Sequence, residues 1–174
     1  PIPAPLAVGA VHQALLHSGQ RPNANIVIET GSARDPHQFA VLLGMGATAI
    51  YPYLAFQSIN QQLDNGALSG EAIELRKNYR RGIRKGLLKI LSKMGICTLA
   101  SYRGSQLFEA VGLSPEVTDM CCPKVTTKIG GAGFAELQED LEKVARQAWT
   151  DQVRPVRDGI YRFMHGGEDH AYTP

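Results

Sequence analysis

The sequence predicts an α/β protein in which a few parallel strands are flanked by helices, and three observations support this fold class. First, residues 26–28 are three consecutive apolar β-branched residues, a pattern typical of a parallel strand covered on both faces. Second, a short helical pattern over 36–43 separates this run from another apolar run over 48–51, which predicts a right-handed βαβ unit. Third, residues 93–113 have the order helix end, apolar strand, polar turn and helix.

Helix signals elsewhere complete this outline. The apolar residues over 5–16 predict a helix, and the prolines before it suit a helix start. Asp35 followed by Pro36 predicts an N-cap for the helix of the βαβ unit. Residues 114–133 have no clear pattern and are expected to be irregular. Apolar residues at helical spacing predict three further helices, over 53–63, 69–94 and 134–149.

The helix over 69–94 is the longest and the most basic. Eight of the chain's 18 basic residues lie on it, mostly away from its apolar stripe. A basic face suits a nucleic acid, but aromatic residues do not interleave with it, so a solvated or interface face is favoured. Gly82 and Gly86 are expected to let another backbone pack closely. The apolar stripe consists of Tyr79, Ile83, Leu87, Ile90 and Met94.

The stretch over 93–113 is the part around which the chain is organised. Gly95 suits the end of the preceding helix, and residues 96–100 are apolar enough for a buried strand. Residues 101–104 then form a polar turn, and a helix is predicted from 105 onward, ending at Gly112. In α/β proteins a turn at the carboxyl end of a strand is where ligands usually bind. The helically spaced apolar residues are Leu107, Phe108 and Val111.

Two groups of residues are candidates for contact with a ligand or another domain. The polar turn offers hydroxyls, a guanidinium and a helix start that suit an anion, although a capping role is favoured. The second group lies at the carboxyl end of the strand over 25–29, a position that suits catalysis, although a salt bridge from its glutamate to an arginine at 34 or 103 is favoured. The candidates are Ser101, Tyr102, Arg103, Gly104, Ser105 and Gln106, and Glu29, Thr30 and Arg34.

Other chemistry has weaker support. Cys97, Cys121 and Cys122 lack the C-x₂-C spacing of iron–sulfur ligands, so free thiols are expected. Residues 165–170 contain two histidines, a glutamate and an aspartate, but without a regular frame a hydrated linker is favoured over a metal site. The glycine-rich run over 130–133 matches no phosphate motif and is expected to be a structural turn. No arrangement for nucleophilic catalysis is visible. Neither a catalytic nor a metal-binding residue is assigned.

The composition favours a globular protein with a hydrophobic core and gives no sign of a membrane span or a disulfide framework. Apolar residues make up 44% of the 174 residues, enough for a hydrophobic core. The formal net charge of +2 does not by itself indicate a nucleic-acid partner, and no apolar run is long enough for a membrane span. The first residues do not have the basic and apolar pattern of a secretory leader, so none is expected, and three cysteines do not suggest a disulfide framework; a cytoplasmic location is therefore expected. The start at Pro1 without Met indicates a piece of a longer chain.

Four longer runs carry a family resemblance. They are NIVIETGSARDPHQFAVLLGMGATAIYPYLA at 25–55, KNYRRGIRKGLLKILSKMG at 77–95, SKMGICTLASYRGSQLFEAVGL at 92–113 and HGGEDHAYTP at 165–174. They resemble segments of the large chain of glutamate synthase, and the resemblance extends from end to end without a gap. Cys97 stands where the family usually has serine, which is a small change.

The resemblance implies a segment of an oxidoreductase of ammonia assimilation. Glutamate synthase converts glutamine, 2-oxoglutarate and a reductant into two glutamates, and the segment resembles the bacterial NADPH-dependent type. Residues 1–149 would be the carboxyl-terminal part of the central domain, a truncated portion of a barrel-like α/β domain. Residues 150–174 would be a linker toward the FMN-binding domain. The segment is expected to join the amidotransferase and FMN domains and to help wall the path of ammonia.

The expected partners are the remaining domains of the same large chain and the small subunit, with neither a nucleic acid nor a membrane. No cofactor is expected in this segment, whereas the parent enzyme carries FMN, an iron–sulfur cluster and, through its small subunit, NADPH. The segment alone is expected to be inactive. One alternative is a basic helical module that binds nucleic acid with a steep salt dependence. Another is a small stand-alone flavin-binding protein, which would keep a visible chromophore on purification.

Overall fold

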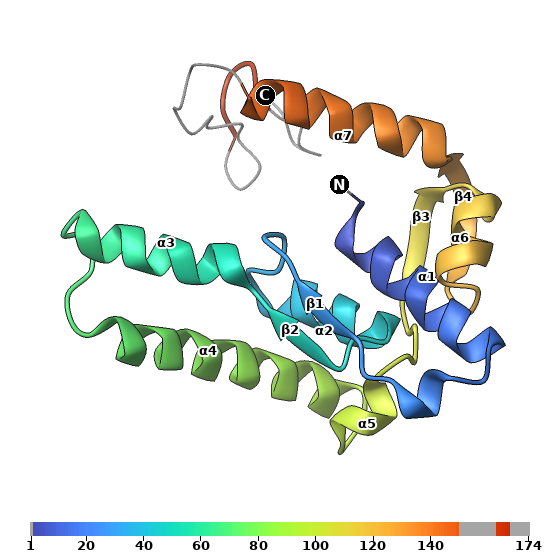
Figure 1. The fold of residues 1–174 in the computed structure, drawn as a ribbon, viewed down its shortest axis with the longest axis horizontal. Helices are drawn as coiled ribbons and strands as arrows, with labels where there is room; N and C mark the ends of the chain where they lie inside the picture. Colours follow the sequence, from blue (N-terminus) through green and yellow to red (C-terminus); the bar gives the residue numbers. More distant parts are fainter. Residues whose placement is uncertain (1, 150–162, 168–174) are drawn as a thin grey trace. The chain divides into compact units, whose positions relative to one another are not determined.

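The computed structural model of this chain describes residues 2–149 and 163–167. The chain divides into two compact parts, an N-terminal body over 1–137 and a C-terminal body over 138–174. The described residues form helices and four short strands, and the strands pair in two separate parallel sheets (Figure 1). The expected α/β class with a few parallel strands is confirmed. The elements are α1 (Ala4–His17), η1 (Arg21–Asn23), β1 (Val27–Glu29), α2 (Pro36–Met45), β2 (Ala49–Tyr51), α3 (Tyr53–Asp64), α4 (Ala72–Lys93), α5 (Leu99–Tyr102), β3 (Glu109–Leu113), α6 (Pro115–Cys121), β4 (Thr126–Ala132) and α7 (Phe134–Ala148).

The first βαβ unit consists of β1, α2 and β2, as predicted. The two strands are parallel, with Val27–Glu29 in register with Ala49–Tyr51. Asp35 caps α2, because its carboxylate accepts the backbone N–H of Gln38 at 3.0 Å while the Gln38 side chain accepts the N–H of Asp35 at 3.2 Å. This reciprocal capping box fixes the point at which the chain leaves the loop after β1 and begins the helix.

Helices α3 and α4 follow and lie side by side, and α4 also packs against α2 (Figure 1). The predicted apolar stripe of α4 is confirmed for most of its length, since Ile83 is buried and Tyr79 packs against the same core. At the carboxyl end Leu91 is buried, whereas Met94 is 40% exposed. The stripe therefore ends one turn earlier than its spacing predicts.

The two glycines of α4 differ in what surrounds them. A Cβ on Gly86 would collide with the ring of Pro36 at the start of α2, so a close approach exists there, although a proline ring rather than a backbone makes it. A Cβ on Gly82 would meet no atom within 4 Å. Only Gly86 is therefore required by the packing of α4 on α2.

The predicted order of strand and helix in the centre of the chain is wrong. Gly95 closes α4 with φ 69°, and the N–H of Ile96 turns back to the carbonyl of Leu91 at 2.9 Å, so no strand forms over 96–100. The helix predicted from residue 105 does not form, and residues 109–113 are strand β3 instead, because pairing with β4 overrides the local helical spacing. Val111, on the predicted apolar face, is 65% exposed.

Residues 114–133 are not irregular as predicted, since α6 and β4 complete a second βαβ unit with β3. Ser114 precedes Pro115 at the first position of α6, a helix start that the sequence contains. Strands β3 and β4 are parallel, with register shifts on both sides of Val111. A Cβ on Gly131 would lie 2.5 Å from the carbonyl oxygen of Gly112, so these backbones approach too closely for side chains.

Helix α1 packs against both α2 and α6 and so joins the two βαβ units. A Cβ on Gly9 of α1 would collide with the backbone carbonyl of Cys121 in α6, which shows how close the two helices lie. The main hydrophobic core is built largely from these three helices. Its buried residues are Ala4, Leu6, Val8, Ile26, Ala33, Phe39, Leu42, Met45, Ala47, Ile83, Val117, Cys121, Cys122 and Val125.

The helix predicted over 134–149 is confirmed as α7, which begins in the N-terminal body and continues into the C-terminal body. The carboxylate of Glu136 accepts the N–H of Gly133 at 2.8 Å at its start. The linker predicted over 150–174 lies outside the described residues apart from 163–167. Among the described residues no helix has the length and apolar character needed to cross a membrane.

Candidate functional site

The residues at the carboxyl end of β1 form a tight turn. Thr30 is buried, and its N–H donates to the carbonyl of Tyr51 at 3.1 Å, which extends the pairing of β1 with β2 by one residue. The Thr30 hydroxyl accepts the N–H of Ser32 at 3.1 Å. Both hydrogen bonds shape the backbone, so Thr30 has a structural role in this turn.

Arg34 also acts through its backbone. Its N–H donates to the side-chain oxygen of Gln38 at 2.7 Å, and its carbonyl accepts the Tyr79 hydroxyl of α4 at 3.0 Å. The side chains of Arg34 and Glu29 are exposed, and Glu29 forms no ion pair with a described residue. The favoured salt bridge from Glu29 to Arg34 or Arg103 is therefore wrong for the described residues.

The polar turn over 101–104 begins within the short helix α5. The cap is Thr98, whose hydroxyl lies 2.9 Å from that of Ser101 and 3.4 Å from its backbone nitrogen. Tyr102 is only 2% exposed and packs among residues of α2 and α4, including Leu43, and this burial raises the pKa of its phenol. Arg103 is exposed. In this turn the side chains of Ser101 and Arg103 are exposed and that of Tyr102 is buried, and a ligand or interface role for the turn stays a prediction.

Residues 104–106, named here the joint, connect the two βαβ units. The N–H of Gly104 donates to the carbonyl of Leu43 at 3.0 Å, and the N–H of Gln106 donates to that of Gly44 at 3.1 Å, both at the end of α2. On the other side, the Gln106 side-chain oxygen accepts the N–H of Lys124, just before β4, at 3.0 Å. Gln106 is therefore hydrogen-bonded both to α2 of the first unit and to the segment just before β4 of the second.

The joint has a strained backbone at Gln106, and some of its buried polar atoms lack a hydrogen-bond partner. Gln106 has φ 52°, the one positive value at a non-glycine position among the described residues. Such a conformation persists where surrounding contacts determine it, as the hydrogen bonds of Gln106 do. Its side-chain nitrogen, the hydroxyl of Ser105 and the side-chain nitrogen of Gln13 in α1 are buried without a hydrogen-bond partner. Buried polar atoms of this kind mark positions where a water or another group usually supplies the bond.

Sequence reasoning did not identify His12 of α1, which lies against the joint. Its Nδ1 accepts the Nε–H of Arg21 at 2.9 Å, and a Cβ on Gly104 would lie 3.2 Å from its Cε1. Burial lowers the pKa of His12, and the positive charges of Arg21, Lys124 and Arg103 lower it further. The only sequence signal for this residue is a polar side chain within the apolar pattern of α1.

The described residues do not form a metal centre. Cys97 is exposed, whereas Cys121 and Cys122 are buried, and burial raises the pKa of both buried thiols. No group of three or more His, Cys, Asp or Glu residues within the described ranges is arranged to hold a metal ion, so these cysteines do not fit an iron–sulfur cluster. Of the residues 165–170, where a hydrated linker is favoured over a metal site, 168–170 lie outside the described residues. Residues 130–132 belong to β4, so the turn predicted over 130–133 is wrong there.

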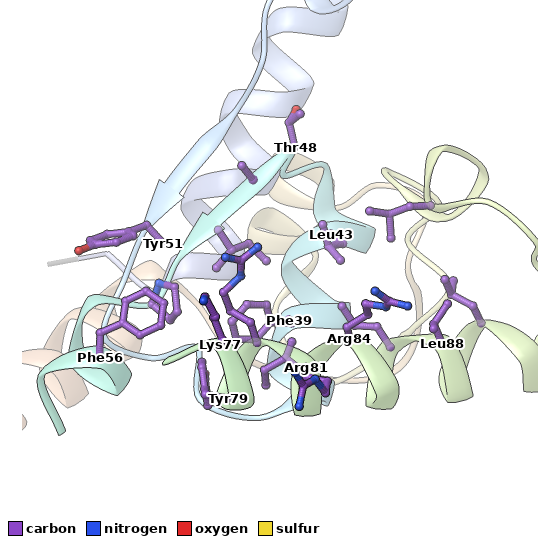
Figure 2. A pocket seen from close by; sticks show the side chains of 18 of the residues that line it. Phe39, Leu43, Thr48, Tyr51, Phe56, Lys77, Tyr79, Arg81, Arg84 and Leu88 are labelled. Atoms are coloured by element: carbon purple, nitrogen blue, oxygen red, sulfur yellow. The ribbon is translucent and has the colours of Figure 1, made fainter. Parts of the chain in front are cut away.

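A groove of about 990 Å³ lies between β2 and α4 (Figure 2). Every residue from Thr48 to Pro52 lines it, together with Phe39 and Leu43 of α2. Aromatic side chains from β2, α3 and α4 and basic side chains of α4 lie around it (Figure 2). The groove contains none of the residues singled out from the sequence as ligand candidates, although some of the basic residues of α4 line it.

Comparison with known proteins shows the family to which this fold belongs. The family model of the glutamate synthase central domain matches residues 1–114. The glutamate synthase [NADPH] large chain of Bacillus subtilis (strain 168) is 40% identical over 178 residues, which cover 100% of this chain and 12% of that protein. The glutamate synthase [NADH] of Saccharomyces cerevisiae is 36% identical, covering 97% of this chain and 8% of that protein.

A third relative differs in its named electron donor. The ferredoxin-dependent glutamate synthase 1 of Arabidopsis thaliana is 40% identical, covering 99% of this chain and 11% of that protein. The chain thus spans about a tenth of the length of the relatives it matches. The match to the Bacillus large chain covers both βαβ units and the joint between them, whereas the family model ends before α6 and β4. The chain belongs to the glutamate synthase central domain family.

Proposed function

We propose that this chain is a structural segment of a glutamate synthase, which forms two glutamates from glutamine, 2-oxoglutarate and a reductant. The observation that carries the proposal is the 40% identity to one continuous piece of the Bacillus large chain over the full length of this chain. The oxidoreductase activity belongs to the assembled enzyme, and the segment alone is inactive. Its partners are the remaining domains of the same large chain.

The segment acts as a scaffold between the amidotransferase and FMN domains and helps wall the path of ammonia. The contacts of the joint support a scaffold, because the backbone N–H groups of Gly104 and Gln106 bond to α2 and the Gln106 side chain bonds to Lys124 before β4, which connects two folded units. Such a wall is useful because it prevents the loss of ammonia to the solvent. FMN and the iron–sulfur cluster are held by other parts of the enzyme. No catalytic residue is assigned here.

The reductant is proposed to be NADPH, supplied through a small subunit in the cytoplasm. The name of the Bacillus relative supports this choice. Identity does not separate the donors, since the relative named for ferredoxin is 40% identical as well. Steady-state assays of the assembled enzyme with NADPH, NADH and reduced ferredoxin test this point directly.

A chimaera tests the scaffold. The matched segment of the Bacillus large chain is replaced by this chain, and the glutamine consumed is compared with the glutamate formed. The proposal expects a folded chimaera that contains FMN and makes two glutamates per glutamine. A chimaera that binds FMN and hydrolyses glutamine to one glutamate and ammonia, but forms no second glutamate from 2-oxoglutarate even with added ammonia, would contradict it.

A flavin titration tests the separate chain. With circular dichroism confirming that it is folded, flavin fluorescence is followed while the chain is added to FMN. Unchanged fluorescence is expected, because the proposal places the flavin site in other parts of the enzyme. Saturable quenching at micromolar flavin would favour a stand-alone flavin protein and would make Ser101 to Gln106 the first residues to substitute.

A further inference from the structure

Strand β2 has a free edge. The sheet contains only β1 and β2, so among the described residues no strand pairs with β2 on the side away from β1. Ala49 donates its N–H to Ile26 at 3.2 Å and Tyr51 accepts the N–H of Thr30, so these two residues point their backbone groups toward β1. By the alternation of a parallel ladder, the N–H and C=O of Ile50 point to the free side. A free edge of this kind is a template for another strand.

The groove described above runs along this edge. Five consecutive residues of the β2 region line it and no residue of β1 does, which places it on the free side (Figure 2). Apolar side chains of α2 and α4, among them Phe39, Ile83 and Leu87, line it as well. Tyr51, Leu88 and Leu99 around it are 49%, 53% and 44% exposed. Uncovered apolar surface beside unpaired backbone groups suits an extended polypeptide.

The charge around the groove is positive and largely unpaired. Lys77, Arg80, Arg81 and Arg84 of α4 all line it. Arg80 and Arg84 form no ion pair with a described residue, and Arg81 hydrogen-bonds only the side chain of Asn78, at 3.1 Å. Lys77 is paired with Glu74 at 2.7 Å on the exposed surface. An occupant that carries carboxylates is therefore favoured, whereas a second copy would bring the same positive charges together.

We propose that the groove binds an extended acidic segment from another part of glutamate synthase, which adds to β2 as a third strand. Its backbone pairs with Ile50, its apolar side chains cover the exposed Tyr51 and Leu88, and its carboxylates meet Arg80 and Arg84. This inference rests on the proposed function, since the relatives are about ten times longer than this chain and supply many candidate segments.

Overlapping peptides of about 12 residues, long enough for a typical strand, identify the segment. They cover the part of the Bacillus large chain outside its match to this chain, and binding is measured by fluorescence anisotropy. We expect an acidic peptide to bind and to protect the Ile50 amide from hydrogen exchange. Methylation of alternate backbone nitrogens in that peptide removes pairing donors and should weaken binding at least tenfold.

Charge variants on one helix provide the matched comparison. The double variant Arg80→Gln/Arg84→Gln should weaken peptide binding at least tenfold, whereas Lys85→Gln/Lys89→Gln, which removes the same charge from positions outside the groove, should leave it unchanged. Circular dichroism confirms the fold of each variant.

Four outcomes would overturn the proposal: no peptide binds, N-methylation has no effect, the two double variants behave alike, or the chain itself dimerises through the groove in ultracentrifugation. The chimaera does not depend on which segment fills the groove. An active chimaera with a groove that binds no peptide therefore rejects this inference and leaves the proposed function in place.

Discussion

The two βαβ units of the N-terminal body differ in strand register and in the capping of their helices. In the first, β1 and β2 pair in continuous register, and α2 begins with a complete capping box. In the second, β3 and β4 pair with two register shifts, and α6 has no side-chain cap hydrogen bond. The first unit is specified locally, whereas the second depends on contacts with α1 and the joint.

This difference places the weak point of the fold at the joint and at α6. Helix α4 packs against α2 of the first unit, and Tyr102 adds a small buried cluster between them. The second unit has an exposed strand, since β4 is exposed over Thr126 to Gly131. Substitutions that loosen the joint should therefore uncouple the second unit before the first.

The largest effect is expected from Tyr102→Ala. Removal of this buried ring leaves a cavity among α2, α4 and Phe108, and large-to-small core changes of this kind cost about 3–5 kcal/mol. Urea unfolding followed by circular dichroism measures the loss. Tyr102→Phe keeps the ring and should cost less than about 1.5 kcal/mol. Equal losses for the two variants would show that the hydroxyl, rather than the ring, stabilises the first unit.

Gln106→Ala tests the joint directly. The variant leaves the N–H of Lys124 without its side-chain acceptor and should lower the free energy of unfolding by about 1–3 kcal/mol. Gln106→Gly loses the same hydrogen bond but relieves the positive φ, so its loss should be smaller. Hydrogen exchange should show the excess opening in β4 and α6. Excess exchange confined to β1 and α2 would reverse the proposed order of stability.

Two glycine substitutions separate packing from helix propensity. Gly9→Ala places a methyl group against the carbonyl of Cys121 and should destabilise the chain by about 1–3 kcal/mol, because α1 must move away from α6. Gly82→Ala adds a methyl group in open space within α4 and should stabilise by about 0.5–1 kcal/mol. Thermal unfolding of both variants checks the opposite signs. A stabilising Gly9→Ala would mean that the contact between α1 and α6 is dispensable.

The smallest effect is a pH dependence from His12. Its pKa is lower in the folded chain than the usual 6.5, so the unfolded chain binds more protons below that pH. The stability that the neutral ring contributes is present above pH 6.5 and is lost as pH falls toward the lowered pKa. Urea midpoints measured from neutral pH downward should fall less steeply for His12→Gln. An identical slope in both chains would show that His12 stays solvated.

Local signals predicted the first unit well. Asp35 with Pro36 and the run Ile26 to Ile28 are short-range patterns, and the structure confirms the helix and strand that they predict. The second unit was missed because its strands are stabilised by each other. Val111 and Ile129 are 65% and 60% exposed, so neither strand carries the apolar signature of a buried strand.

The candidate site was predicted only in part. The sequence located the polar turn, but it did not show that Gln106 connects α2 with the segment before β4, because Leu43, Gly44 and Lys124 are distant in sequence. His12 was missed for the same reason. The groove along β2 depends on which edge of the sheet is free, and this follows from the pairing rather than from any motif.

The short crossovers also bear on how the chain folds. Val27 pairs with Ala49 and Glu109 pairs with Thr126, so each parallel pair closes over a short stretch of chain. Parallel strands usually fold slowly because their contacts are distant in sequence, and loop closure costs entropy before pairing repays it. Here each pair closes within one helix and its loops. On a ribosome, the first sheet can therefore form before the residues of the second have been synthesised.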